Sequence, residues 1–220
     1  IKQGSYIHNG NTLNSFYGER KFTTQNFWAQ HPGQAVNTMQ FNAALQSIMT
    51  MGFGFLGKRQ QKATSDAFSS YGAPTTGDVM SSVRNILAII DGKQTSGQFF
   101  QNFTWSTNKN ARQNNRLGAF DPFEIIPGSM SVTGSLATFY NSNEMINKWL
   151  DGNDDELTVI LVDNAGSLYV FDFPRVKYSS GSNNATGRNQ DALIQLGFQA
   201  IKDPDQTEEI SMRIARFPAA

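Results

Sequence analysis

Apolar and polar residues alternate most regularly over residues 127–140 of the chain. Successive side chains of a β-strand point to opposite faces, so this period of two predicts a long strand with one buried face and one polar face. The large apolar positions are Met130, Val132, Leu136 and Tyr140. The small hydroxyl positions are Ser129, Ser131, Thr133 and Ser135.

Residues 46–55 repeat this design. One predicted face carries Met49, Met51, Phe53 and Phe55, and the other carries Ser47, Thr50, Gly52 and Gly54. The run at 47–52 also aligns with the run at 129–134, and each long strand follows another aromatic or methionine-containing strand. This hint of duplication predicts a single domain over residues 1–220 with two related strand-pair halves, at about 1–95 and 96–220.

The rest of the chain reads mainly as short strands separated by turns. Strands are predicted once or twice within 5–28 and at 36–41, 83–90, 99–107, 157–162, 167–173, 191–202 and 210–217. Turns are predicted at 31–33 and 91–92, and Pro174 is expected to limit its strand. Polar composition predicts loops at 57–77, 109–115 and 179–189.

One short helix is predicted at residues 142–150. Met145 with Trp149 and Ile146 with Leu150 stand four residues apart and form one apolar stripe. Asn141 is expected to cap its start and Gly152 to occupy the left-handed position after its end. A helix this short needs a sheet to pack on, so the fold class is mainly β with one flanking helix.

The amino-acid composition further narrows the range of possible functions. The chain has 220 residues, 18 basic and 18 acidic side chains, no cysteine and two histidines. Charge neutrality gives no sign of a nucleic-acid clamp or a polybasic membrane anchor, and the apolar runs are too short for a transmembrane helix. Without cysteine there are no disulfides or thiolate metal sites, which fits folding in a reducing compartment. We expect neither cofactor nor metal.

Several motifs resemble chemical sites without meeting their requirements. The glycines at 52, 54 and 57 fit a phosphate-loop spacing, but Arg59 stands where a Walker loop needs Ser or Thr, and the glycines lie inside a strand pattern. Residues 151–156 lack the glycine and glutamate positions of a calcium loop. Phe99, Phe103 and Trp105 are expected to be core rather than a stacking platform. No catalytic constellation is present, so an enzyme is the least favoured function.

The order of several segments resembles the major tail tube proteins of long-tailed, siphovirus-type bacteriophages. The resemblance covers about residues 36–214. It rests on the segments 35–39, 48–58, 127–140, the helix to Trp149 and Leu150, 173–177 and 196–200.

The resemblance implies a β-sandwich or barrel with long hairpins and one short flanking helix. It implies a homo-oligomer of hexameric rings that stack into a tube, with other tail proteins at the tube ends. Strand pairs of neighbouring subunits would join into one barrel around a channel for transient, non-specific passage of DNA during genome ejection. The implied location is the virion tail, assembled in the cytoplasm of the bacterial host.

We therefore assign two faces to the long strands. The candidate channel-facing residues are Ser47, Thr50, Ser129, Ser131, Thr133 and Ser135. The candidate packing residues are Met49, Met51, Phe53, Phe55, Met130, Val132, Leu136 and Trp149. A register slip of one residue would exchange the faces. The loops at 58–77 and 179–189 are candidates for contacts between stacked rings.

Two alternatives remain open from the sequence. The inner tube of a contractile tail, or of a related secretion apparatus, shares the same architecture and pattern. A carbohydrate-binding β-sandwich would also show alternating strands and exposed aromatic residues.

Overall fold

The computed structural model describes residues 5–10, 12–73, 86–90, 93–94, 100–140, 143–163, 165–184, 191–204 and 210–218. The first strands are β1 (Ser5–His8), β2 (Phe16–Phe22), β3 (Phe27–Ala44), β4 (Thr50–Leu56), β5 (Gln61–Ala63), β6 (Ile86–Ile90) and β7 (Lys93–Gln94), with a 3-10 turn at Thr23–Gln25. The later strands are β8 (Phe100–Asn108), β9 (Arg112–Asn114), β10 (Glu124–Ile126), β11 (Ser131–Phe139), β12 (Asp155–Val162), β13 (Leu168–Asn184), β14 (Leu193–Ala200) and β15 (Arg213–Phe217). The helix α1 (Glu144–Asp151) lies between β11 and β12. The mainly-β prediction is confirmed.

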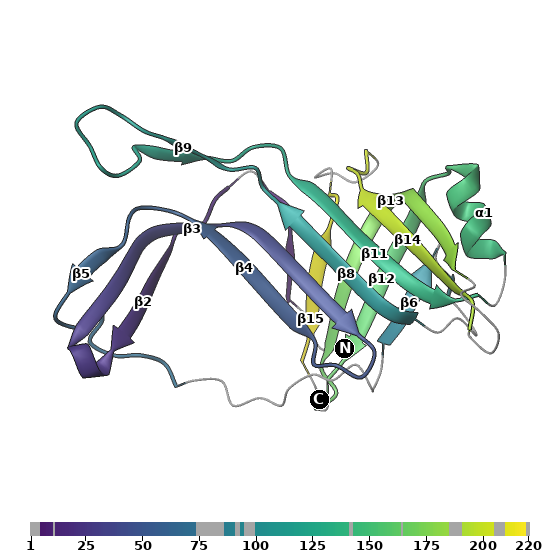
Figure 1. Cartoon of the computed structure of the whole chain (residues 1–220), viewed down its shortest axis with the longest axis horizontal. Coiled ribbons are helices and arrows are strands. Elements are labelled where there is room, and N and C mark those ends of the chain that lie inside the picture. The colour runs from purple at the N-terminus through teal and green to yellow at the C-terminus, as the bar shows by residue number, and fades with distance from the viewer. Residues whose placement is uncertain are drawn as a thin grey trace.

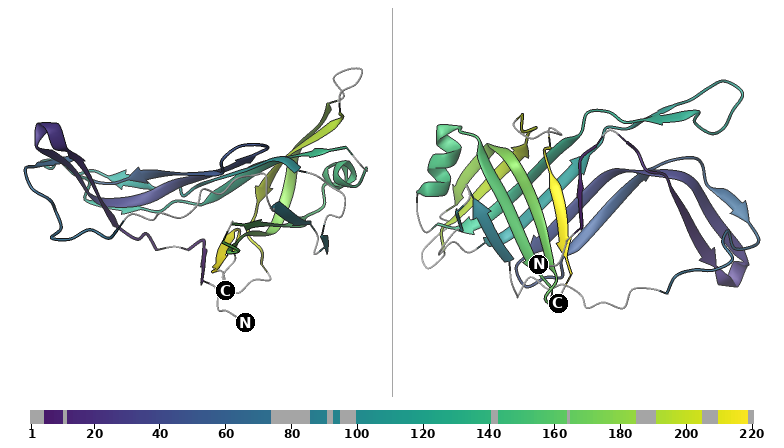
Figure 2. Two further views of the ribbon diagram at one scale, coloured as in Figure 1. Left: turned by 90° about the horizontal axis from the view of Figure 1, so that it is seen from below. Right: turned by 180° about the vertical axis from the view of Figure 1, so that it is seen from behind.

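Two β layers form the body of the molecule (Figure 1). We call the first layer the front sheet; its strand order is β4, β3, β8, β11, β14 and the end of β13 (176–184). The back sheet consists of β7, β6, β12, the start of β13 (168–176), β15 and β1. Since β13 belongs to both, the two layers are one continuous sheet that folds over on itself, as the turned views in Figure 2 show.

Aromatic side chains join the layers. The ring centroids of Phe41 and Phe171 lie 4.7 Å apart, and those of Phe173 and Phe198 lie 5.4 Å apart. Trp105 lies 5.4 Å from Phe171 and is 2% exposed. Fully burying one such side chain contributes about 1.5–3 kcal/mol, so this cluster is a major source of the fold's stability.

Two prolines lie inside strands because each coincides with a β-bulge. The predicted turn at 31–33 is wrong, since β3 continues through it while the pairing with β2 shifts and Gly33 adopts φ +61°. The predicted limit at Pro174 is also wrong, since β13 continues to Asn184. There the pairing with β12 shifts between Asp155 and Leu157. A bulge leaves one residue out of the hydrogen-bonded ladder, so the missing N–H of proline costs little.

The loop predicted at 179–189 is a strand where the structure describes it. Residues 179–184 belong to β13 and, after a bulge at Ser179, pair with β14 from Ser180 to Asn184, while 185–189 lie outside the described residues. The polar loop predicted at 109–115 contains β9, which pairs with β10 in a short ribbon projecting from the body (Figure 1). Polar segments can therefore form strands when a partner strand lies beside them, which composition alone does not reveal.

The first half of β3 extends beyond the sandwich, where it pairs with β2 and β5. The segment that follows β5 folds back onto this extension, because the Tyr71 hydroxyl donates to Glu19 and the Ala67 N–H donates to Glu19 Oε2 over 2.9 Å. These bonds lower the pKa of Glu19 from its ordinary value, with the Tyr71 bond the largest cause. Part of the predicted 58–77 loop is thus fastened to β2, and residues 74–77 lie outside the described residues.

Helix α1 packs on the sheet through Met145, Ile146 and Trp149 as predicted, but Leu150 of the predicted stripe is exposed and the cap differs from the prediction. Asn143 stands at the N-cap position without a side-chain cap bond, because its Oδ1 accepts from the Tyr140 hydroxyl instead. Residues 141–142 lie outside the described part. Gly152 is left-handed at φ +64°, as predicted, and Met145 is 1% exposed in the core.

The strands predicted at 99–107, 157–162, 191–202 and 210–217 agree with β8, β12, β14 and β15 to within three residues. By contrast, β3 begins nine residues before the strand predicted at 36–41, and β4 and β11 each begin four residues after the predicted starts at 46 and 127. The hairpin of β12 and β13 surrounds 163–167, and β6 and β7 flank the predicted turn at 91–92, which itself lies outside the described residues. Within the described ranges, no helix has the length and apolar character needed to cross a bilayer.

The close approach at Gly134 gives a stability prediction. A Cβ added there would lie 2.5 Å from the Thr104 carbonyl oxygen and would overlap the ring of Phe198. We expect Gly134→Ala to lower the free energy of unfolding by about 1–3 kcal/mol, because the packed core cannot yield to the extra methyl group. Urea denaturation of the purified protein measures this change.

Gly52→Ala is the matched control in the same sheet. A Cβ at Gly52 meets no atom within 4 Å, so we expect a change below about 1 kcal/mol, in the stabilising direction. Equal losses in the two variants would show that steric overlap at Gly134 is not the cause.

Candidate functional site

The front sheet turns one face away from the core, and cross-strand register makes that face polar across six strands. We call this surface the polar face. Its first row is Thr50, Asn42, Thr104, Ser135, Gly197 and Ser180. Its second row is Gly52, Gln40, Ser106, Thr133, Gln199 and Lys177. Its third row is Gly54, Thr38, Asn108 and Ser131. Lys177 is the one charged residue in these rows.

Hydroxyl groups on the polar face pair with one another across strands. The Thr104 and Ser135 hydroxyl oxygens lie 2.8 Å apart, and those of Ser106 and Thr133 lie 3.2 Å apart. These bonds hold the short side chains close to the sheet. The central part of the face forms a shallow open hollow of about 720 Å³, lined by these hydroxyls and by Gln40 and Thr50.

Four of the six predicted channel-facing residues lie together on the polar face: Thr50, Ser131, Thr133 and Ser135. The other two lie outside the strands. Ser47 is in the turn after β3, where its hydroxyl donates to the Ala44 carbonyl over 2.8 Å. Ser129 precedes β11, and its carbonyl accepts from Asn110 Nδ2 over 2.7 Å.

β8 and β14 also contribute to this face, which the sequence pattern did not predict. Thr104 and Ser106 alternate with the buried Phe103 and Trp105, and Gln195 and Gln199 alternate with buried apolar positions of β14. The period-two signal was therefore present in both strands. The missing information was the strand order, which places them beside β11.

The predicted packing residues divide into two groups. Val132 and Leu136 are 1% and 2% exposed, and Met49, Met130 and Trp149 are partly buried against the core. Met51, Phe53 and Phe55 are 40%, 51% and 53% exposed, although the register places Met51 and Phe53 on the core side of the sheet. Within one chain these three do not pack inward, because β4 is the edge strand of the front sheet. We call them the β4 strip.

Ion pairs lie away from the polar face. Arg213 pairs with Asp172 at 2.5 Å on the back sheet. Lys148 of α1 pairs with Asp155 at 2.8 Å. Beside that pair, burial and the Asp155 charge raise the pKa of Tyr178 far above its ordinary value. These ion pairs stabilise the back sheet and the packing of α1, whereas the polar face is nearly neutral.

The structure also bears on the phosphate-loop, aromatic-stacking and metal-binding sites that the sequence suggested as alternatives. Gly52 and Gly54 lie inside β4, which confirms the strand interpretation over a phosphate loop. Phe103 and Trp105 are 3% and 2% exposed, so they are core as predicted, while Phe99 lies outside the described residues. Among the described residues, no cluster of His, Cys, Asp or Glu could hold a metal ion.

The two outer strands of the front sheet are available for pairing. On their outer sides, neither β4 nor residues 177–184 of β13 pairs with another strand of the described part of the chain. All neighbouring strands are antiparallel, so six strands alternate in direction and β4 runs opposite to β13. A second copy could therefore extend the sheet in the same antiparallel sense.

The chain matches a known protein family. A profile described as "Phage tail tube protein" matches residues 7–200. The matched range contains all six strands of the front sheet, and helix α1 with them. A comparison with curated proteins finds no match.

The two faces of β11 give a direct test of the face assignment. We expect Val132→Lys to lower the free energy of unfolding by about 3–5 kcal/mol, because it places an unpaired charge in the core. The matched variant is Thr133→Lys, one residue along on the exposed side, for which we expect a change within about 0.5 kcal/mol. Thermal and urea unfolding measure both. A Val132→Lys protein as stable as the parent would reverse the assignment.

Proposed function

The chain belongs to the phage tail tube protein family, and from this premise we propose that copies of it close into rings whose polar faces line a channel for DNA. The protein is a structural component of the virion tail. In the proposed assembly, six copies form a ring and rings stack into a tube, with other tail proteins at its ends. Assembly takes place in the host cytoplasm, and the protein carries out no catalysis.

Ring closure is supported by the two free sheet edges. Pairing β4 of one copy with β13 of the next keeps the antiparallel alternation, because each copy contributes an even number of strands. Exposed strand edges promote uncontrolled aggregation, and a closed barrel removes them. The same pairing repeated around a ring leaves no free edge in the wall.

The composition of the polar face supports DNA passage. Tight binding to duplex DNA requires many cationic contacts with phosphates, and Lys177 is the one cation in the three rows. The rows contain no carboxylate that would repel the phosphate backbone. Short hydroxyl and amide side chains can exchange hydrogen bonds with water and phosphate without holding the DNA in place.

The single observation that carries the proposal is the polar face itself, in register across six strands and almost without charge. The inner tube of a contractile tail or a secretion apparatus would have the same geometry. For a carbohydrate-binding module, the aromatic residues considered as a stacking platform on β8, Phe103 and Trp105, are buried and unavailable to a sugar.

Electron microscopy of the purified protein tests the assembly. At rising protein concentration, negatively stained samples are expected to show rings or hollow tubes of constant diameter, with sixfold symmetry in end-on views. Assembly is expected to increase with protein concentration because it requires the sheet edges of different copies to pair. A protein that stays monomeric at all concentrations and binds glycans would contradict the proposal.

A charge added to the polar face tests the channel. Under the hexameric proposal, Thr133→Arg places six guanidinium groups in each ring. Tubes of this variant are expected to retain short duplex DNA at low salt, and the affinity is expected to fall steeply as salt rises, since each added phosphate contact contributes about −0.9 to the salt slope.

Ala165→Arg is the matched control, because Ala165 is exposed in the turn between β12 and β13 of the back sheet, away from the polar face. These tubes are expected to behave like the parent. Equal DNA retention in both variants would show that the polar face does not line the channel.

A further inference from the structure

The β4 strip is an apolar surface that one chain leaves uncovered. Met51, Phe53 and Phe55 stand on an edge strand, where soluble monomers normally place charged or short side chains. Phe55 has one aromatic neighbour, Phe16, at 6.4 Å between centroids. Phe53 lines a groove of about 670 Å³ together with Phe16, Val36, Met39 and Met130. A large apolar patch of this kind marks a binding surface.

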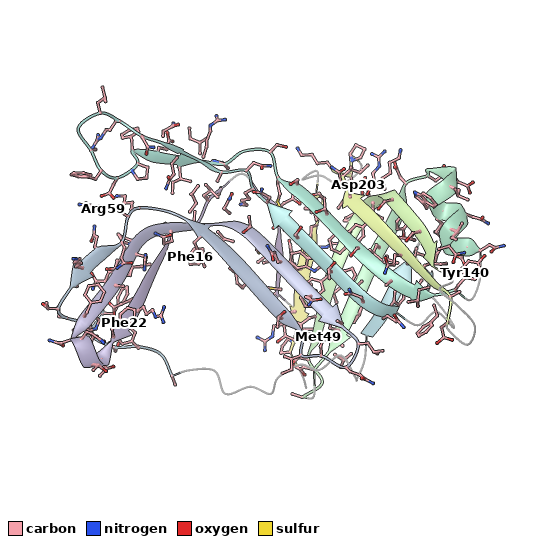
Figure 3. All side chains as sticks on the ribbon, viewed as in Figure 1. Phe16, Phe22, Met49, Arg59, Tyr140 and Asp203 are labelled. Atoms are coloured by element: carbon pink, nitrogen blue, oxygen red, sulfur yellow. The ribbon has the colours of Figure 1, made fainter. Side chains whose placement is uncertain are left out.

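Helix α1 lies at the opposite edge of the same sheet, on the same side. An added Cβ at Gly181 of β13 would lie 2.5 Å from the Trp149 ring, so the helix packs directly over this strand. Gly181 pairs with the buried Leu196, which places the helix on the apolar side of the front sheet. The figures show α1 and β4 at opposite ends of the front sheet (Figures 1 and 3).

The outer surface of α1 carries apolar side chains that its own sheet does not fully cover. Leu150 is 64% exposed, and Ile146, one turn earlier, is partly buried and packs against the core of its own chain. Residues four apart lie on one helix face, so these two form a stripe beside the Trp149 contact. Leu150, the exposed end of this stripe, and the β4 strip are both open in the single chain.

We propose that helix α1 of one copy docks through Ile146 and Leu150 on the β4 strip of the next copy. The inference rests on the proposed function, because pairing β13 of one copy with β4 of another brings the helix of the first to the apolar side of β4. Edge pairing alone leaves the β4 strip uncovered and gives α1 no part in assembly. The proposed docking covers the strip with α1 of the neighbouring copy.

Interface area supports this occupant. β4 has seven residues, so strand pairing alone would join two copies through one short ladder. Stable interfaces bury at least about 1,000 Å² in total. A Phe side chain can bury about 150–250 Å², so covering Phe53 and Phe55 with a helix face supplies much of the area that the ladder lacks.

The contact also explains how a ring can leave no β4 strip exposed. Each copy offers one strip and one helix, at opposite edges of one sheet. Such a head-to-tail contact uses two different surfaces, and it closes when the rotation between copies returns to the start. Every strip in a closed ring is then covered by the helix of a neighbour.

Disulfide cross-linking tests the contact, because the chain has no cysteine of its own. Three double variants combine Leu150→Cys with Met51→Cys, Phe53→Cys or Phe55→Cys. Oxidation by copper phenanthroline in assembled samples is expected to join neighbouring copies in at least one variant and to give a ladder of covalent oligomers on non-reducing gels. The same variants kept as monomers at low concentration are expected to give no ladder.

Thr50→Cys with Leu150→Cys is the matched control, since Thr50 lies on the polar face of the same strand. Maleimide labelling of the single variant Leu150→Cys is the second measurement, and at least tenfold slower labelling is expected in tubes than in monomers. Tubes without cross-links and with unchanged labelling would overturn the docking inference while leaving the tube proposal intact. Failure of the parent protein to assemble at all would overturn both.

Discussion

The packing of one sheet layer on the other is the constraint on which both faces of the molecule depend. Phe171 and Phe173 of the back sheet contact three aromatic side chains of the front sheet, which are Phe41, Trp105 and Phe198. This contact determines which side of each front-sheet strand faces the core. Because side chains alternate along a strand, the outer side is fixed at the same time. The neutral polar face is therefore a direct consequence of an aromatic core behind it.

Much of the fold follows from periodicity, whereas the extent of the functional surface does not. The alternation in β11 identified Val132 and Leu136 as buried and Thr133 and Ser135 as polar, which the register and burial agree with. Thr104 and Ser106 carry the same signal, but their place beside β11 depends on long-range pairing that no local pattern encodes. The exposed β4 strip was predicted to be packed, because an apolar face indicates burial without indicating which chain provides the cover.

The errors in strand boundaries have one physical source. The local sequence predicts that a strand ends at Pro32-Gly33 and at Pro174. In the structure both sites are bulges within long strands. A bulge needs a partner strand to exist, so its recognition requires the tertiary fold. Residues 179–184 were misread for a related reason, since serine, glycine and asparagine are poor strand formers and are held in β13 by pairing with β14.

The continuity of β13 has a mechanical consequence. Its first half is clamped between β12 and β15 in the core, and its second half forms the free edge of the front sheet. A pull on that edge is carried by covalent backbone into the best-packed region, where it loads many hydrogen bonds in shear at once. In an assembly joined through this strand, a load along the strand would pass into the core of each copy and would not be confined to a surface contact.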